Sequence, residues 1–517
     1  MPNYLYKNYF LGSIFLIFIS FLAHFFIFER YSVGPDDYEF FLMKEEGWRF
    51  FLIHPDRPFQ YIWFQLQNSL VGIDGFRGLL LIFFSSSLTI LASFLFLRVL
   101  TKNNSLSFLL SLIYVLLIHK LEVFHYPVNA HVNLSSSLYI FSLYFFIRYF
   151  DNFTNLNLYL SIIFYSFGLF WYEVGFFLPL IMLSYMAISK KEYILNRKII
   201  LFGSFLLFIV IFYSVYRISG AFGFAQTMAG RSISLQSLPG GFIDVFHIFV
   251  GRSFIRSALY GFYLFFQMSY LMVFLLLLFN SITVGILYHF FKEEGPIRVD
   301  KQLISFFILL ILLTVIPNIL VGSIGGRNTI ISSIGISYLV LLLIFSFKKF
   351  SKYLLSLFIF LCLIIGQGNS WAQVVSSKIN GSVFNVLSLK KEEIAKHDYV
   401  LIDTKSFADN IEFSFLSRDY NVLNTYYGAQ TFEDWGLKSM VKISQQTFNN
   451  KPKVFISTSD IIERDSQLYF YISNLKGYRS IEKEEVNLDK RRVFLINFDL
   501  VFKDNNKSIE KKFNKIL

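Results

Sequence analysis

Long apolar segments recur through the first two thirds of the chain, and no other feature constrains its fold as strongly. A helix needs about 17 to 25 mostly apolar residues to cross a bilayer. Segments of this kind, or slightly shorter, lie near residues 10–28, 78–97, 105–119, 134–149, 157–171, 174–189, 199–217, 259–291, 302–320, 329–347 and 353–367. Only 16% of the 517 residues are charged, against about 25% in an ordinary soluble protein. We therefore expect a polytopic α-helical membrane protein with about eleven transmembrane helices.

Three local features refine this expectation. The segment 259–291 is long enough to contain a re-entrant piece, and 157–171 is joined very tightly to 174–189. Arg30, rather than a small-residue cleavage site, follows the first apolar segment, so we interpret that segment as a retained span. Cys362 is the only cysteine, which excludes disulfides within the chain and cysteine-based metal sites.

Basic residues predict the orientation. Cytoplasmic loops of membrane proteins are enriched in lysine and arginine. With a cytoplasmic N-terminus, every inner turn is basic, through Lys7, Arg98, Lys102, Arg148, Lys190, Lys191, Arg197, Lys198, Lys292, Arg298, Lys301, Lys348, Lys349 and Lys352. The net charge of +12 is explained in this way, and the chain carries no nucleic-acid-binding motif. Because Phe, Ile, Asn and Lys are frequent, as in AT-rich bacteria, we place the protein in a bacterial inner (cell) membrane.

The composition changes after residue 370. Residues 371–517 are polar, with strand-like apolar runs at 399–403, 453–457 and 492–499 and an amphipathic helical pattern at 433–447. We predict a transmembrane domain over residues 1–370, which includes an outer loop at 29–77. An extracytoplasmic α/β domain is predicted over 371–517.

The outer loops of the predicted membrane domain are basic mainly through arginine. A planar guanidinium binds phosphate or carboxylate in a bidentate manner, which favours a phosphate-bearing ligand on the outer face. Alternatively, these arginines extend to the interface or pair with acids such as Glu45, Glu46 and Asp74. The set comprises Arg30, Arg49, Arg57, Arg77, Arg217, Arg231, Arg252, Arg256 and Arg327, against only Lys44 and Lys120 among the lysines.

The first outer loop carries the candidate catalytic residues. Asp36 and Asp37 follow Gly34-Pro35 directly after the first span, and the aromatic-rich amphipathic run 38–51 comes next. Carboxylates at a membrane edge are costly unless paired or used, so one of them is a candidate general base. They are equally well explained as a helix N-cap. Further along the loop, HPDRP supplies His54, Asp56 and a phosphate- or sugar-binding Arg57, although Asp56 and Arg57 could also simply pair with nearby groups.

Three further outer segments carry polar groups. The loop KLEVFHYPVNAHVN contains Glu122, His125, Tyr126, Asn129 and His131, which suit sugar hydroxyls or a divalent metal ion, or act as interfacial anchors. Glu173 lies between apolar segments, where it faces a cavity or marks a turn. In GSIGGRN, Arg327 follows a glycine-rich turn before a helix, a pattern that binds anions or serves the turn alone.

The acidic pair after the first span, the amphipathic run behind it, the multi-span body and the C-terminal domain together resemble the GT-C superfamily of membrane glycosyltransferases. The resemblance covers the architecture of nearly the whole chain, but its motif part is short. There is no WWDYG-type acceptor motif, which argues against an oligosaccharyltransferase.

The resemblance implies a fold, substrates and roles. A polyprenyl-phosphate sugar is the expected donor, and a glycan, lipid or protein hydroxyl is the acceptor. Asp36 or Asp37 is the expected base for an inverting transfer, and Arg327 and Arg57 are expected to stabilise the leaving phosphate. Membrane lipids and the lipid-linked donor are the expected partners, with no nucleic acid.

Other functions fit parts of the same sequence. An O-antigen-type polymerase or ligase would centre on the 219–257 loop with Arg231, Arg252 and Arg256. A lipid-linked glycan transporter would show internal repeats and polar residues at the bilayer midplane, whereas the charges here gather on one face. A non-catalytic assembly protein would tolerate substitution of both aspartates.

Overall fold

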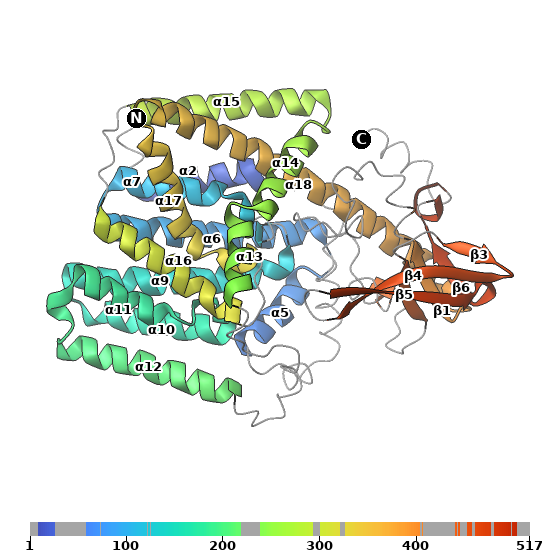
Figure 1. Cartoon of the computed structure of the whole chain (residues 1–517), viewed down its shortest axis with the longest axis horizontal. Helices are drawn as coiled ribbons and strands as arrows, with labels where there is room; N and C mark the ends of the chain where they lie inside the picture. Colours follow the sequence, from blue (N-terminus) through green and yellow to red (C-terminus); the bar gives the residue numbers. More distant parts are fainter. Residues whose placement is uncertain are drawn as a thin grey trace.

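The structure is a computed structural model of the whole chain. It comprises a large helical bundle and a small β-containing unit beyond one end of the bundle, and helix α18 (Ser351–Leu389) joins them (Figure 1). The residues described are 9–25, 58–72, 74–120, 123–124, 126–218, 238–292, 300–320, 326–403, 406, 440–441, 443–444, 452–457, 461–476, 480–497 and 499–503.

The helices of the bundle run broadly along one axis (Figure 1). They are α2 (Tyr9–Ser20) with its π-helical continuation η1 (Phe21–Phe25), α6 (Gly75–Thr101), α7 (Asn104–Leu116), α9 (Ala130–Asn152), α10 (Asn155–Trp171), α11 (Leu178–Ser189), α12 (Arg197–Ile218), α15 (Tyr270–Lys292), α16 (Lys301–Leu320), α17 (Ser332–Ser346) and the first half of α18. Among the described residues, seven helices are long and apolar enough to cross a membrane, and four shorter apolar helices accompany them. These features indicate a multi-pass membrane protein.

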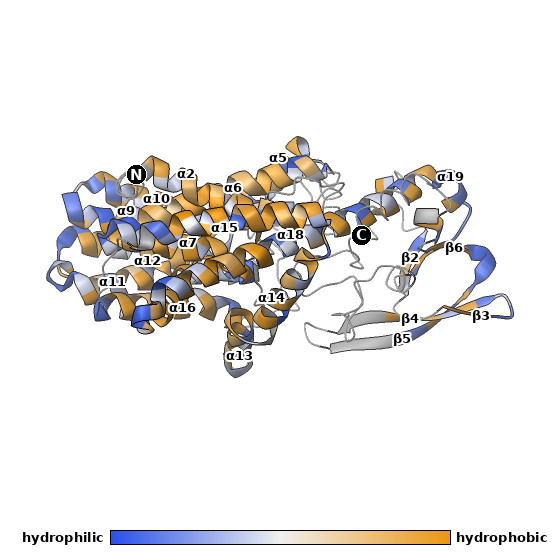
Figure 2. Ribbon diagram, turned by 90° about the horizontal axis from the view of Figure 1, so that it is seen from above, coloured by the Kyte–Doolittle hydropathy of each residue, from blue (hydrophilic) through white to orange (hydrophobic). Residues whose placement is uncertain are grey.

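Apolar side chains both fill the bundle and cover its outside. Inside, α7 is buried almost throughout its length. Outside, α12 exposes Leu201, Phe205, Phe208 and Phe212, and the bundle helices are mostly hydrophobic along their length (orange in Figure 2). An apolar surface of this extent is unusual in a soluble protein and suits a lipid environment.

The predicted single span 259–291 is wrong, because the segment contains two helices. Helix α14 (Arg252–Phe265) ends before Gln267, and α15 begins at Tyr270, with the Ser269 hydroxyl accepting a hydrogen bond from the Met272 amide at 3.4 Å. Helix α13 (Leu238–Phe249), which falls in a predicted loop, precedes α14. Both α13 and α14 run across the bundle axis (Figure 1).

A three-stranded parallel sheet forms the centre of the C-terminal unit. The order is β2 (Lys453–Ser457), β1 (Tyr399–Asp403), β6 (Val493–Ile496), with Leu401 opposite Phe455 and Leu495. The predicted strands 399–403 and 453–457 are confirmed, and β6 lies within the third. Of the helix predicted at 433–447, only residues 440–441 and 443–444 are described, and they are helical.

Both faces of this sheet are covered, as expected for parallel strands. Val375, Ile379 and Val383 of α18 pack on Val400 and Ile402. On the opposite face, Leu401 packs against an antiparallel sheet that the sequence did not reveal, formed by β3 (Ile462–Arg464), β4 (Gln467–Lys476) and β5 (Ser480–Asp489).

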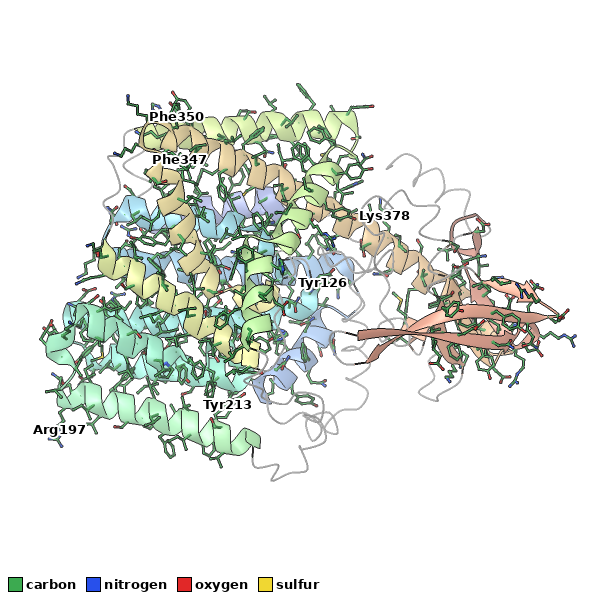
Figure 3. All side chains as sticks on the ribbon, viewed as in Figure 1. Tyr126, Arg197, Tyr213, Phe347, Phe350 and Lys378 are labelled. Atoms are coloured by element: carbon green, nitrogen blue, oxygen red, sulfur yellow. The ribbon has the colours of Figure 1, made fainter. Side chains whose placement is uncertain are left out.

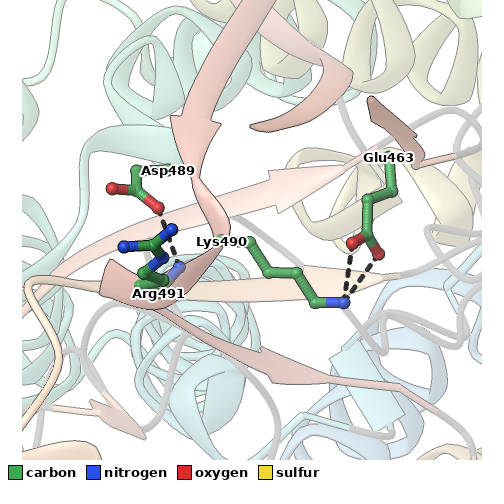
Figure 4. A network of polar contacts seen from close by, with 4 residues as sticks. All are labelled: Glu463, Asp489, Lys490 and Arg491. Atoms are coloured by element: carbon green, nitrogen blue, oxygen red, sulfur yellow. Dashed lines mark hydrogen bonds and ion pairs between the residues drawn. The ribbon is translucent and has the colours of Figure 1, made fainter. Parts of the chain in front are cut away.

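An ion pair links the two outer strands of the antiparallel sheet, β3 and β5. Lys490, which follows β5, binds both carboxylate oxygens of Glu463 on β3 at 2.8 and 2.7 Å (Figure 4). Beside it, Asp489 accepts a hydrogen bond from the Arg491 amide at 3.0 Å. These groups are exposed, so we assign the ion pair a minor share of stability.

The bundle has two chemically different ends. The turns predicted to be cytoplasmic gather at one of them, the lysine end, where Lys102 pairs with Asp151 at 2.9 Å and Lys198 donates to Asn155 at 3.1 Å. Arg197 lies at this end and Tyr126 towards the other (Figure 3). The other, domain-side end continues through α18 into the C-terminal unit (Figure 1).

Candidate functional site

Polar side chains from four predicted outer segments meet at the domain-side end. The Tyr172 hydroxyl donates a 2.8 Å hydrogen bond to Asn328 Oδ1, and the Tyr172 ring stands edge-on to His131 at 5.4 Å. Gln60 Nε2 lies 3.1 Å from His131 Nε2. We call Gln60, His131, Tyr172 and Asn328 the domain-side cluster.

Helix α5 (Pro58–Leu70) brings Gln60 to this cluster. Phe59 stacks on Phe167 at 5.0 Å, and Trp63 lies 5.8 Å from Trp171, so the helix packs against the end of α10 through aromatic rings. Trp63 Nε1 donates to Gln67 Oε1 one turn later, at 3.0 Å. Aromatic residues with a polar edge suit the boundary between an apolar bundle and its surroundings.

The end of the first span is fixed by a polar stretch of α18, residues 366–370 (GQGNS). Gln367 Nε2 donates to the Leu22 carbonyl at 3.1 Å, and the Ser370 hydroxyl donates to the His24 carbonyl at 2.6 Å. Gln367 also exchanges two hydrogen bonds with the buried Asn280 of α15, at 2.8 and 2.9 Å. These bonds tie α18 to the backbone of η1.

Both ends of the segment that carries the predicted catalytic pair therefore lie near the domain-side cluster. Phe25 packs with Phe124 and Ala130, directly before His131. Pro58 begins α5, whose Phe59 approaches Trp171 at 6.5 Å. The predicted residues within that segment, namely Asp36, Asp37, His54, Asp56 and Arg57, lie outside the described residues.

A buried lysine lies where α7 gives way to the second predicted outer loop. Lys120 ends the 3-10 turn η2 (Ile118–Lys120) with 1% of its surface exposed. Its ammonium donates to the Tyr114 carbonyl and lies 3.4 Å from the centre of the Tyr114 ring and 5.2 Å from that of Phe124. Burial holds the pKa of Lys120 well below its ordinary value.

Two buried histidines flank this lysine. The His24 ring stacks on Phe124 at 4.7 Å and lies 3.2 Å from the Val115 carbonyl through Nε2. His119 Nε2 lies 2.7 Å from the hydroxyl of Ser333 on α17. Aromatic rings, carbonyls and imidazoles thus surround the Lys120 ammonium.

Of the other predicted site residues, the structure describes Tyr126, Glu173 and Arg327. Tyr126 is buried, and its hydroxyl accepts a 3.5 Å hydrogen bond from Gln373 of α18. Glu173 begins the 3-10 turn η4 (Glu173–Gly175), directly after Tyr172. Arg327 lies in the 3-10 turn η8 (Gly326–Thr329), next to Asn328. Glu122 and His125 lie outside the described residues, on either side of Val123 and Phe124.

Within the described ranges, no group of three or more His, Cys, Asp or Glu side chains is placed to hold a metal ion. The metal expectation depended on Glu122, His125 and His131. Glu122 and His125 are outside those ranges, so that expectation stays a prediction. Cys362 is buried in α18.

Several of these residues were not selected from the sequence. Gln60 has no motif around it that separates it from ordinary interfacial residues, and Asn328 was noted only as the last residue of GSIGGRN. His131 was selected from the second outer loop, but its contacts with Gln60 and Tyr172 were not predicted. The GQGNS stretch had a usable signal, because five small or polar residues interrupt an apolar helix. Lys120 was counted only as a loop charge, since sequence does not reveal burial.

No protein-family model matches the chain, and no curated protein matches its sequence. The activity is therefore inferred from the residues and their placement. Amide, hydroxyl, imidazole and ammonium groups at the end of an apolar bundle suit a ligand that carries hydroxyls, negative charge and an apolar tail.

Proposed function

We propose that this chain is a GT-C-like membrane glycosyltransferase that moves a sugar from a polyprenyl phosphate to an acceptor hydroxyl. In this proposal about eleven helices cross a bacterial inner membrane, the lysine end faces the cytoplasm, and the domain-side end faces the extracytoplasmic space. The acceptor is a glycan, a lipid or a protein.

One observation carries the proposal. Three polar loops and both ends of the Asp36–Asp37 segment meet at the bundle end from which the C-terminal unit extends. A lipid-linked donor needs an apolar body for its prenyl chain and polar groups beside it for its phosphate and sugar. The bundle is the apolar body in this proposal, and the domain-side cluster at its end contains the polar groups.

The proposed chemistry uses side chains alone. Asp36 or Asp37 takes the proton from the acceptor hydroxyl, whose oxygen attacks the anomeric carbon from the face opposite the phosphate. The bond between that carbon and the phosphate oxygen breaks, and the phosphate leaves with the bonding electrons. Cationic groups, with Arg57 and Arg327 as candidates, stabilise the developing negative charge. The configuration at the anomeric carbon is inverted.

Paired substitutions test this proposal. We expect Asp36→Asn or Asp37→Asn, expressed at wild-type level in cells lacking the native gene, to remove one sugar from the surface glycans while its polyprenyl-phosphate donor accumulates. Mass spectrometry of lipid-linked sugars measures both changes.

Asp74→Asn is the matched control, because Asp74 is an exposed aspartate that caps α6 by accepting from the Phe76 and Arg77 amides at 2.9 and 3.0 Å. Its substitution should cost at most about 1 kcal/mol of stability and leave the glycans unchanged. Wild-type glycans in both Asp36→Asn and Asp37→Asn cells would refute an aspartate-based transfer.

A further inference from the structure

Lys120 is electrostatically unusual. Its side chain is buried, yet among the described residues no carboxylate lies within ion-pair distance of its ammonium. Its neighbours are the Tyr114 carbonyl and the rings of Tyr114 and Phe124. A buried charge is normally paired with an opposite charge, because taking it out of water costs several kcal/mol.

Among the residues that the structure describes, the titratable groups around Lys120 add no negative charge. His24 shares the Phe124 ring with it, and His119 precedes it in η2. Aromatic faces attract an ammonium without neutralising it. The described surroundings therefore hold an amine, two imidazoles and no acid, so an anion that enters them favours the protonated form of Lys120 and meets no repulsion from a described carboxylate.

We propose that Lys120 binds the phosphate of the lipid-linked donor. This inference rests on the proposed function and adds a residue that the resemblance did not select. The anion belongs to the amphiphilic donor and not to free phosphate, because Lys120 lies where an apolar helix gives way to a polar loop.

The position of Lys120 supports this assignment. Turn η2 lies beside η8, the turn with Arg327 and Asn328, and His119 bonds Ser333 just beyond it. Lys120 also begins the loop that leads to Tyr126 and His131. A lysine side chain is long and flexible and carries three donors, so a phosphate oxygen can replace the Tyr114 carbonyl as its partner.

The test compares two ligands that differ only in the phosphate. Purified protein in nanodiscs is titrated with geranylgeranyl phosphate and with geranylgeraniol, and the ratio of the two affinities isolates the contribution of the phosphate. We expect Lys120→Met to lower this ratio about ten- to a hundredfold, as for loss of one charge-assisted hydrogen bond. Lys120→Arg should restore most of it.

Two controls keep the test decisive. Lys102→Met removes an exposed lysine at the lysine end and should leave the ratio unchanged. Lys120→Gln, which can still donate to the Tyr114 carbonyl, replaces Lys120→Met if that variant does not fold. An unchanged ratio in a folded Lys120 variant overturns the proposal, as does displacement of the lipid by millimolar inorganic phosphate alone.

The outcome is separable from that of the proposed function. A protein that binds the prenyl phosphate through Lys120 but transfers no sugar would leave this inference standing and refute the enzyme. If the wild-type protein transfers sugar but the Lys120→Met variant still prefers the phosphate ligand, the enzyme proposal stands and this inference is refuted.

Discussion

At the residue scale, Lys120 shows how burial changes the meaning of a loop charge. The sequence presents it as one of many basic residues at span ends, whereas the structure buries it between Tyr114 and Phe124. A buried lysine without an acid destabilises the ligand-free protein whenever it carries a proton. If Lys120 is kept for ligand binding, replacing it with an apolar residue should therefore increase the stability of the ligand-free protein.

We expect Lys120→Met to stabilise the ligand-free protein by about 1–2 kcal/mol near neutral pH. The native state lowers the pKa of Lys120, so it binds this proton more weakly than the unfolded state. The penalty is therefore complete at low pH and disappears as the pH rises towards about 10.4, the unfolded value. Thermal unfolding across pH should show the gain at neutral pH and its loss near pH 10. A variant that is less stable at every pH would indicate a purely structural lysine.

At the element scale, helix α18 contacts both the bundle and the C-terminal unit. Its apolar first half was predicted as a span that ends at 367, but the helix continues to Leu389. The polar residues 366–370 do not end it because they bind carbonyls of η1 and the amide of Asn280. Its last turns pack on the parallel sheet. Tertiary contacts, which a sequence does not show, thus decided the length of the helix.

The crossing of α14 and α18 depends on two glycines. A Cβ built on Gly368 would lie 1.7 Å from the Gly261 carbonyl oxygen, so even alanine forces the helices apart. We expect Gly368→Ala to destabilise the protein by about 1–3 kcal/mol, as in other overpacked contacts, and thermal unfolding in detergent measures this. Gly285→Ala on α15 is the matched control, since nothing lies within 4 Å of its Cβ. Equal melting temperatures for the two variants would contradict this crossing.

Prediction from sequence succeeded where one physical signal dominated. The strand 399–403 was found because Val400, Leu401 and Ile402 form a continuous apolar run buried on both faces. The strand 480–489 was missed because its Glu- and Lys-rich sequence, SIEKEEVNLD, hides the β pattern. Helix α13 was missed because Pro239-Gly240-Gly241 in its first turn is typical of a loop.

At the scale of the whole molecule, the bundle carries lysine-rich turns at one end and neutral polar side chains at the other. The lysine end gathers the basic turns, and the domain-side end gathers Gln60, His131, Tyr172 and Asn328. Loop charges in the sequence predicted this division. They did not predict which residues of different loops touch, because contacts such as Tyr172 with Asn328 join positions 156 residues apart.

The α5–α6 turn strengthens the link between the two parts. Val71, just after α5, is buried in the same apolar cluster as Val375 and Ile379 of α18 and Val400 of β1. The C-terminal unit therefore holds the bundle through α18 and through the turn that follows α5. Since α5 also carries Gln60, the unit helps to position the domain-side cluster.

The central claim is that the segment with Asp36 and Asp37 joins the domain-side cluster in one site. Its most direct test is cross-linking in native membranes, in a Cys362→Ser background that removes the only cysteine. Cysteines replace Asp36 and Asn328 in one protein, and Asp36 and Arg197 in a control. Our account predicts that a short thiol cross-linker joins the first pair and leaves the second, whose Arg197 lies at the lysine end, unlinked. Failure to link positions 36 and 328 in a folded protein, or linkage of 36 to 197, would contradict it.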